Sequence, residues 1–132
     1  MRYATIQGIR FDGVCACVPA DTVDNVAFGA GLFGEEIENA VRSTGVRTRR
    51  VCPPGGVTAL DLAVRAAKTL LDSHSLSPGE VGGVLFITQT PDHNMPNNAS
   101  RAAYLLGLPT ACVATDASLA CSGYVYVCGW EL

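Results

Sequence analysis

The sequence predicts an α/β fold in which helices connect the strands of a mostly parallel sheet. Strand and helix patterns alternate four times along the chain, which is the order of a crossover-connected sheet. Residues 81–90 (VGGVLFITQT) form a nearly continuous apolar run, typical of a strand covered on both faces. Residues 58–73 carry apolar side chains at helical spacing. With 132 residues, 48% of them hydrophobic, the chain is expected to form one unit with a real core.

The first half of the chain is expected to contain two strands separated by a short helix. Residues 9–14 (IRFDGV) alternate apolar and polar side chains, and the apolar run 14–18 (VCACV) continues them. The first element is therefore predicted as a long strand or a hairpin. Residues 34–43 predict a short helix with acidic side chains in its first turn, ended by Gly45. Residues 46–51 (VRTRRV) are predicted as a strand.

The second half is expected to alternate regularly after a break at residues 53–56 (PPGG). The helix over 58–73 is followed by a brief helical turn that Ser77 and Pro78 open, because proline suits the first helical position. The strand over 81–90 comes next.

The last predicted elements lead to a cysteine. A helix is predicted over 98–106, with small and apolar side chains on its inner face. A buried strand is predicted over 110–117 (TACVATDA), and a further helix is expected to begin near Cys121.

Composition and charge exclude several classes of protein. The formal net charge is −3 and only 16% of the residues are charged, which argues against nucleic-acid binding because such domains are usually basic. The apolar stretches are shorter than the ~18 residues that a membrane-spanning helix needs. The N-terminal residues lack the continuous apolar core of a signal peptide, so a cytoplasmic protein is expected.

The six cysteines show no metal-binding or disulfide pattern. There is no Cys-x-x-Cys spacing, and Cys15 and Cys17 would share one face of a strand. His74 and His93 are the only histidines that could complete a metal site. We therefore expect no metal, and we interpret most of the cysteines as small buried apolar residues.

Cys121 is the candidate reactive residue. It lies in the stretch 117–132 (ASLACSGYVYVCGWEL), after a predicted strand and at the predicted start of a helix. Unpaired N–H groups and the dipole of a helix start favour a thiolate, but full activation needs a histidine or another polar partner. Gly123, with small Ala120 and Ser122, would let a substrate carbonyl approach a backbone oxyanion donor. On these residues alone, Cys121 could also be one more packed core residue.

Four stretches, which follow one another along the chain as they do in that family, resemble β-ketoacyl-[acyl-carrier-protein] synthase III, a condensing enzyme of the thiolase superfamily. ACSGYVY, residues 120–126, resembles the nucleophile motif of that family. STGVRTRRV, residues 43–51, resembles its TGI-x-x-RR segment. Residues 59–71 followed by 81–92 resemble its helix-then-strand block, and MPNNASRAAYLLGL, residues 95–108, resembles its Pro-led helix ending in LGL. The resemblance covers nearly the whole chain.

This resemblance implies a fold and a reaction. Residues 1–132 would be the N-terminal half of a duplicated five-layered α-β-α-β-α fold, ending on the nucleophile helix, with the second half absent. Cys121 would take an acyl group from acyl-coenzyme A as a thioester. A malonyl group on acyl carrier protein would then be decarboxylated and attack that thioester in a Claisen condensation. The histidine and asparagine that stabilise the carbanion lie in the family's second half.

The resemblance also implies partners and further site residues. Acyl-coenzyme A would be a substrate rather than a permanently bound cofactor, and acyl carrier protein and a second copy in a homodimer would be partners. Met95 stands where the family has a residue that crosses the dimer interface and shapes the partner's acyl pocket, although a flexible core filler is the alternative interpretation. Arg47, Arg49 and Arg50 would meet coenzyme A phosphates or the acidic carrier protein, or they would form a solvated strand end.

Two features depart from the family pattern and leave alternatives open. The family often has an adenine-stacking tryptophan near the position of Asn39, whereas the only tryptophan here is Trp130. After GYVY the chain continues as VCGWEL instead of an alanine-rich helix. A polyketide or hydroxymethylglutaryl synthase is one alternative, and a truncated or non-catalytic chain that pairs with a partner is another. Neither His74, at a helix end, nor His93, in a loop, is expected to act as a base.

Overall fold

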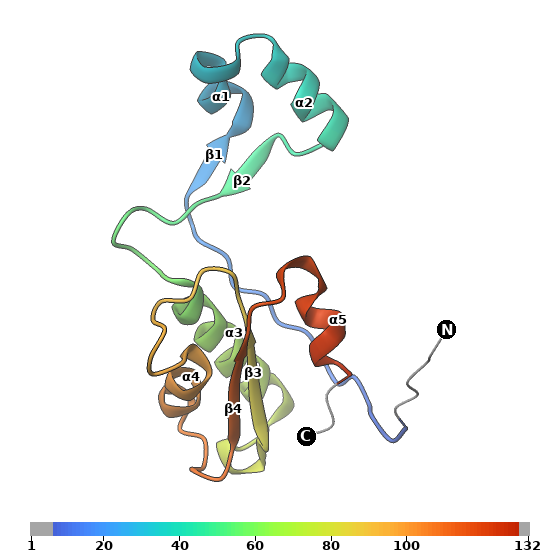
Figure 1. The fold of residues 1–132 in the computed structure, drawn as a ribbon, viewed down its shortest axis with the longest axis vertical. Coiled ribbons are helices and arrows are strands. Elements are labelled where there is room, and N and C mark those ends of the chain that lie inside the picture. Colours follow the sequence, from blue (N-terminus) through green and yellow to red (C-terminus); the bar gives the residue numbers. More distant parts are fainter. Residues whose placement is uncertain (1–6, 130–132) are drawn as a thin grey trace. The chain divides into compact units, whose positions relative to one another are not determined.

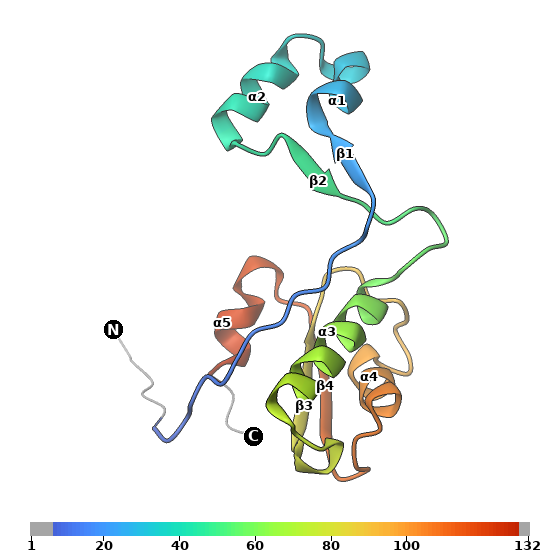
Figure 2. The same ribbon diagram turned by 180° about the vertical axis from the view of Figure 1, so that it is seen from behind.

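The computed structural model describes residues 7–129, which form two compact units (Figure 1, Figure 2). The first unit comprises residues 7–17 and 59–129, and the second comprises residues 18–58. Among the described residues, no helix combines the length and the apolar character needed to cross a membrane.

The first unit is built on a pair of parallel strands. Its elements are α3 (Ala59–His74), the 3₁₀ turn η1 (Pro78–Glu80), β3 (Gly83–Ile87), α4 (Asn98–Leu106), β4 (Val113–Ala117), the 3₁₀ turn η2 (Ala120–Ser122) and α5 (Gly123–Val127). β3 pairs with β4 in a register that runs from Gly83 opposite Val113 to Ile87 opposite Ala117. Because the two strands are parallel, their carboxyl ends lie at the same edge of the sheet.

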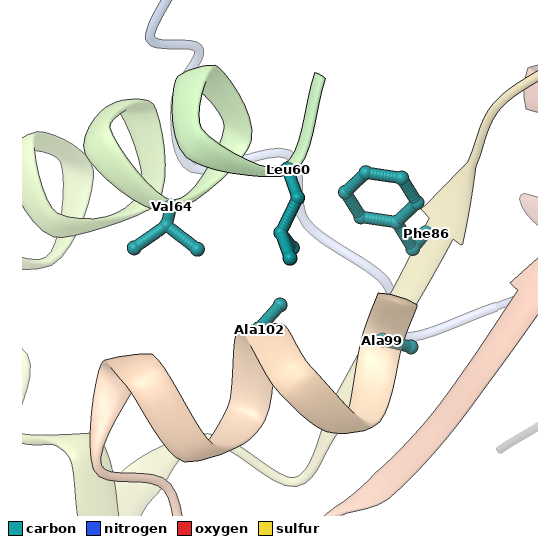
Figure 3. Close-up of a cluster of buried hydrophobic side chains, with 5 residues drawn as sticks. All are labelled: Leu60, Val64, Phe86, Ala99 and Ala102. Carbon is teal, nitrogen blue, oxygen red and sulfur yellow. The ribbon is translucent and has the colours of Figure 1, made fainter. Parts of the chain in front are cut away.

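One face of this sheet is covered by α3 and α4. Figure 3 shows the cluster that joins them to β3: Leu60, Val64, Phe86, Ala99 and Ala102. The small alanines let α4 approach closely, while the larger side chains fill the space between helices and strand. This cluster is the hydrophobic core of the unit.

The opposite face of the sheet contacts α5. Successive side chains of a strand point to opposite faces, and Phe86 belongs to the core cluster, so Ile87 lies on the other face. Gly123, the first residue of α5, packs against Ile87 there. The sheet therefore separates α5 from α3 and α4.

The second unit is a two-stranded antiparallel ribbon with two helices. Its elements are β1 (Thr22–Asp24), α1 (Asn25–Phe33), α2 (Glu36–Thr44) and β2 (Thr48–Arg50). α1 and α2 approach closely at Gly29, where a Cβ would lie 2.6 Å from Cγ1 of Ile37. Only glycine leaves enough space for this contact.

Asp24 connects the strands of the second unit to α1. Its Oδ1 accepts hydrogen bonds from the backbone N–H groups of Val26 (2.9 Å) and Ala27 (3.1 Å), which caps the helix. Its Oδ2 accepts from Nε of Arg47 at 3.1 Å. The N–H of Ala27 is the main reason why the pKa of Asp24 is lowered, and Arg47 adds to the effect.

Most of the elements predicted from sequence are confirmed. α4 has the predicted bounds, because Asn97 caps its start through Ser100 and Gly107 ends it with a φ of 68°. α2, α3 and η1 lie within a residue or two of their predicted positions. β2, β3 and β4 are shorter than the predicted runs 46–51, 81–90 and 110–117.

One expectation about the first half of the chain is wrong, and one of its helices was not predicted. The strand or hairpin predicted over 9–18 is absent, since residues 7–21 contain no strand. The burial of residues 12–17 does alternate, but a strand also needs a hydrogen-bonded neighbour, and the described residues supply none. α1 was not predicted, because Gly29 and Gly31 weaken the helical signal of its sequence.

We expect Leu60→Ala to lower the free energy of unfolding by about 2–5 kcal/mol, because it leaves a cavity in the core. Leu60 is only 2% exposed. Urea denaturation would measure the change. Leu105→Ala is the matched control. Since Leu105 is 42% exposed, this variant should lose much less free energy of unfolding. Equal losses would show that the cluster in Figure 3 is not the core.

Acid should weaken the second unit through Asp24. Because the folded pKa of Asp24 lies below the ordinary value of 3.8, its stabilisation is complete above that value and is lost as the pH falls through the folded pKa. Asp24→Asn should therefore reduce the fall in melting temperature between pH 6 and pH 3 (~3 pH units, which include the ordinary carboxyl pKa at which the loss begins). Asp21→Asn, at an exposed neighbouring position, should leave the fall unchanged.

Candidate active site

Cys121 lies on a short turn that follows a parallel strand. After β4 ends at Ala117, the chain passes into η2, where the side chain of Cys121 is exposed. Ala120, just before it, has a φ of 50°, in the left-handed region that residues with a Cβ rarely adopt. The hydroxyl of Ser122 donates to the carbonyl of Leu119 at 2.8 Å and closes the turn. The thiol is therefore presented to solvent by a locally strained backbone.

The helix after Cys121 differs from the expected one. It begins at Gly123, after the 3₁₀ turn, and has five residues. A helix this short supplies little of the dipole that was expected to favour a thiolate at Cys121. The thiol of Cys128, one turn further, raises the pKa of the Tyr124 phenol by accepting its hydrogen bond. Trp130 and Leu132, expected near the end of this helix, lie outside the described residues.

Gly123 is required by the contact between α5 and β3. A Cβ at this position would lie 2.6 Å from Cγ2 of Ile87, well inside the contact distance of two carbon atoms. The φ of Gly123 is −53°, an ordinary helical value, so close packing and not backbone conformation selects glycine. Gly123 was predicted to let a substrate approach, which stays a prediction, and the structure adds that it makes room for Ile87.

A hydrogen-bonded pair, half-buried Asp116 and buried Asn98, connects β4 to the start of α4. Oδ2 of Asp116 accepts from the backbone N–H (2.8 Å) and the side-chain Nδ2 (2.9 Å) of Asn98. Oδ1 of Asp116 accepts from the N–H of Ala99 at 2.7 Å. Asn98 is fully buried, and its Nδ2 also donates to the carbonyl of His93 (3.2 Å) while its Oδ1 accepts from the N–H of Asp92 (3.1 Å). We call these contacts the Asp116–Asn98 clamp.

The clamp borders a cavity at the carboxyl edge of the sheet. The cavity has a volume of about 230 Å³, and its wall includes Thr88, His93, Asn94, Asp116 and Ser118. Ligands of open α/β sheets bind outside the carboxyl ends of the strands, so this is the edge at which a substrate is expected. The segment leading to Cys121 and the loop between β3 and α4 both start here.

Met95 and the two histidines lie in the first unit. Met95 is in the loop between β3 and α4 and is 89% exposed, so it is not a core filler among the described residues. His93 belongs to the same loop, as predicted, and lines the cavity. His74 is the last residue of α3, and its Nε2 would lie 2.7 Å from a Cβ at Gly13. His74 therefore packs against the N-terminal segment.

The three arginines lie on or beside β2 in the second unit. Arg47 pairs with Asp24, and Nη1 of Arg50 donates to the carbonyl of Ala20 at 2.7 Å. The guanidinium of Arg49 lies 4.6 Å from the centre of the Phe28 ring, a cation–π contact, and Arg49 also donates to Asn25. Each arginine thus has a structural contact, and Arg49 pairs with no carboxylate within residues 7–129.

The Asp116–Asn98 clamp was not predicted from the sequence. A carboxylate inside the apolar stretch ACVATDA is a signal that could have revealed it, because a half-buried charge in a strand requires hydrogen-bond donors nearby. Within residues 7–129, no cluster of histidine, cysteine, aspartate or glutamate side chains is arranged to hold a metal ion.

Comparison with known proteins shows what this chain resembles. No protein-family model matches the sequence. β-Ketoacyl-[acyl-carrier-protein] synthase III of Nitratidesulfovibrio vulgaris (strain DP4) is 43% identical over 109 residues, covering 76% of this chain and 32% of that protein. A 3-oxoacyl-(acyl-carrier protein) synthase of Burkholderia xenovorans LB400 has a solved structure with a TM-score of 0.78 and 29% identity, over 88% of this chain and 35% of that one. AbyA1, a tetronic acid condensing enzyme, matches with a TM-score of 0.70 and 32% identity, over 86% of this chain and 36% of that one.

The predicted resemblance and fold class are therefore confirmed. The chain is similar to β-ketoacyl-[acyl-carrier-protein] synthase III in sequence and in structure. Its mixed α/β fold is thiolase-like and is consistent with one half of a duplicated thiolase fold. The chain spans about a third of the length of the curated relatives that it matches.

Gly123→Ala should destabilise the chain by about 1–3 kcal/mol, because the new methyl group overlaps Ile87. Thermal or urea unfolding would measure this loss. Adding Ile87→Ala should recover part of it, since the two substitutions share one contact. Gly82→Ala is the control, as a Cβ there meets no atom within 4 Å. Additive effects of the Gly123 and Ile87 substitutions would contradict the close contact.

Proposed function

We propose that this chain forms the N-terminal part of a condensing enzyme of the β-ketoacyl-[acyl-carrier-protein] synthase III kind, and that Cys121 is its acyl-carrying nucleophile. The observation that carries this proposal is the exposed thiol of Cys121 on the turn after β4, at the carboxyl edge of a parallel sheet. The similarity to proteins named as acyl-carrier-protein synthases supports it.

In the proposed reaction, the sulfur of Cys121 attacks the carbonyl carbon of an acyl-coenzyme A thioester. The bond from that carbon to the coenzyme A sulfur breaks, and free coenzyme A leaves as a thiol with the proton that Cys121 gives up. Malonyl-acyl carrier protein then loses carbon dioxide, and the resulting carbanion attacks the thioester on Cys121. The bond from the acyl carbon to the Cys121 sulfur breaks, the product is a β-ketoacyl-acyl carrier protein, and the released thiolate takes up a proton from water to regenerate the thiol.

This proposal assigns no permanently bound cofactor, because acyl-coenzyme A supplies the activated acyl group. Condensation would also need the histidine and asparagine of the family's second half to stabilise the carbanion. Exposed Met95 would meet a second copy in a homodimer. Arg49 and Arg50, whose charges no carboxylate balances among the described residues, are better placed than Arg47 to meet a coenzyme A phosphate or an acidic carrier protein. The enzyme would act in the cytoplasm.

A specialised condensing enzyme is the second candidate. The sequence is 32% identical to that of AbyA1, a tetronic acid condensing enzyme, over 86% of this chain. Asn39 stands where the family often has a tryptophan for the adenine of coenzyme A. Both observations favour an acyl donor other than ordinary acetyl-coenzyme A, with the same nucleophile.

We expect Cys121 to become acylated when the chain is incubated with acyl-coenzyme A. Intact-protein mass spectrometry should show one added acyl group, and peptide mapping should place it on Cys121 because its thiol is exposed at the sheet edge. A panel of acetyl-, medium-chain and dicarboxylic acyl-coenzyme A donors would separate the two candidates.

The controls are Cys121→Ala and Cys128→Ala. The first should abolish the adduct, whereas the second should keep it, although Cys128 is also exposed. An adduct that survives Cys121→Ala would refute the assignment of the nucleophile.

A further inference from the structure

Two segments that leave the same sheet edge are held together by one carboxylate. β4 leads through Ala117 to the turn of Cys121, and β3 leads into the loop that carries His93 and Met95. Asp116 stands next to the end of β4 and accepts hydrogen bonds from the first residues of α4. Through Asn98, the same carboxylate reaches the backbone of Asp92 and His93 in the loop. The clamp thus sets the position of both segments at once.

The clamp permits a single arrangement of these segments. The side chain of Asn98 is fully buried and uses both its amide nitrogen and its oxygen. Removing the carboxylate of Asp116 would leave buried N–H donors without an acceptor, which is unfavourable. Small displacements of the β4 end relative to the loop are therefore opposed by several hydrogen bonds at once.

The turn of Cys121 depends on the position of the end of β4. The carbonyl of Ala117, next to Asp116, accepts a hydrogen bond from the N–H of Thr88 at 3.2 Å, which joins the ends of β4 and β3. Beyond this point, Ala120 has its unfavourable positive φ. A strained residue keeps such a conformation only when its surroundings enforce it. If the end of β4 were released, Ala120 would relax and the sulfur of Cys121 would move.

We propose that Asp116 and Asn98 are positioning residues that orient Cys121 for acyl transfer, although neither touches the reacting atoms. This inference rests on the proposed function of Cys121. Asp116 and Asn98 affect the rate of the reaction through the backbone of β4 and the loop. They contribute little to the affinity for acyl-coenzyme A.

The test is single-turnover acylation of Cys121 by acyl-coenzyme A, followed by intact mass over a range of donor concentrations. Asp116→Asn should lower the rate at saturation by about 10- to 100-fold, the effect of a displacement near 1 Å, with little change in the half-saturating concentration. Asn98→Ser should lower this rate less, because both backbone hydrogen bonds to Asp116 persist. Val64→Ala, in the core but outside the clamp, is the matched control and should keep the wild-type rate. Circular dichroism would confirm that each variant folds.

Alkylation by iodoacetamide separates this inference from the proposed function. Peptide mass spectrometry would follow Cys121, with Cys52 of the second unit as an internal reference. The clamp substitutions should change the alkylation rate of Cys121 and leave that of Cys52 unchanged, whether or not acyl-coenzyme A reacts. Unchanged Cys121 kinetics in both assays, or an equal loss in Val64→Ala, would overturn the positioning role. Failure of the wild-type chain to acylate, with altered alkylation in the variants, would overturn the proposed function alone.

Discussion

The hydrogen bonds of the Asp116 carboxylate are the interaction on which the first unit depends. This single side chain caps the start of α4, holds buried Asn98 and fixes the end of β4. A carboxylate at a helix N-terminus is favoured by the free N–H groups and by the dipole. The result is a junction at which a strand, a helix and a loop meet beside a cavity of about 230 Å³. Core packing under α3 and α4 stabilises the unit, and the junction sets the relative positions of these three segments.

The two units differ in how they are stabilised. The buried apolar side chains among the described residues all belong to the first unit, and Gly29 is the one buried residue in 18–58. The second unit is connected instead by polar and cation–π contacts, namely those of Asp24 with Arg47 and of Arg49 with Phe28. Each such exposed contact contributes little. The second unit is therefore expected to be less stable than the first.

Local signals in the sequence predicted the parts of the fold that depend on local interactions. α4 was predicted within its true bounds, because its capping residues Asn97 and Gly107 are encoded next to the helix itself. The predicted strand over 9–18 failed, since an alternating pattern cannot say whether a partner strand is present. The short motif ACSGYVY pointed to Cys121. Asp116 was missed because its hydrogen-bond partners lie far from it in the sequence. No local pattern contains such a contact.

The fit of Gly123 against Ile87 has a consequence for the spacing of α5 and β3. Since no methyl group fits between the two residues, the side chain at position 87 acts as a spacer, whose size limits how closely the start of α5 approaches the strand. Ile87 belongs to a strand and carries no reactive group. The separation of α5 and β3 can therefore be adjusted at a residue of the strand, while the sequence of the turn that carries Cys121 stays unchanged.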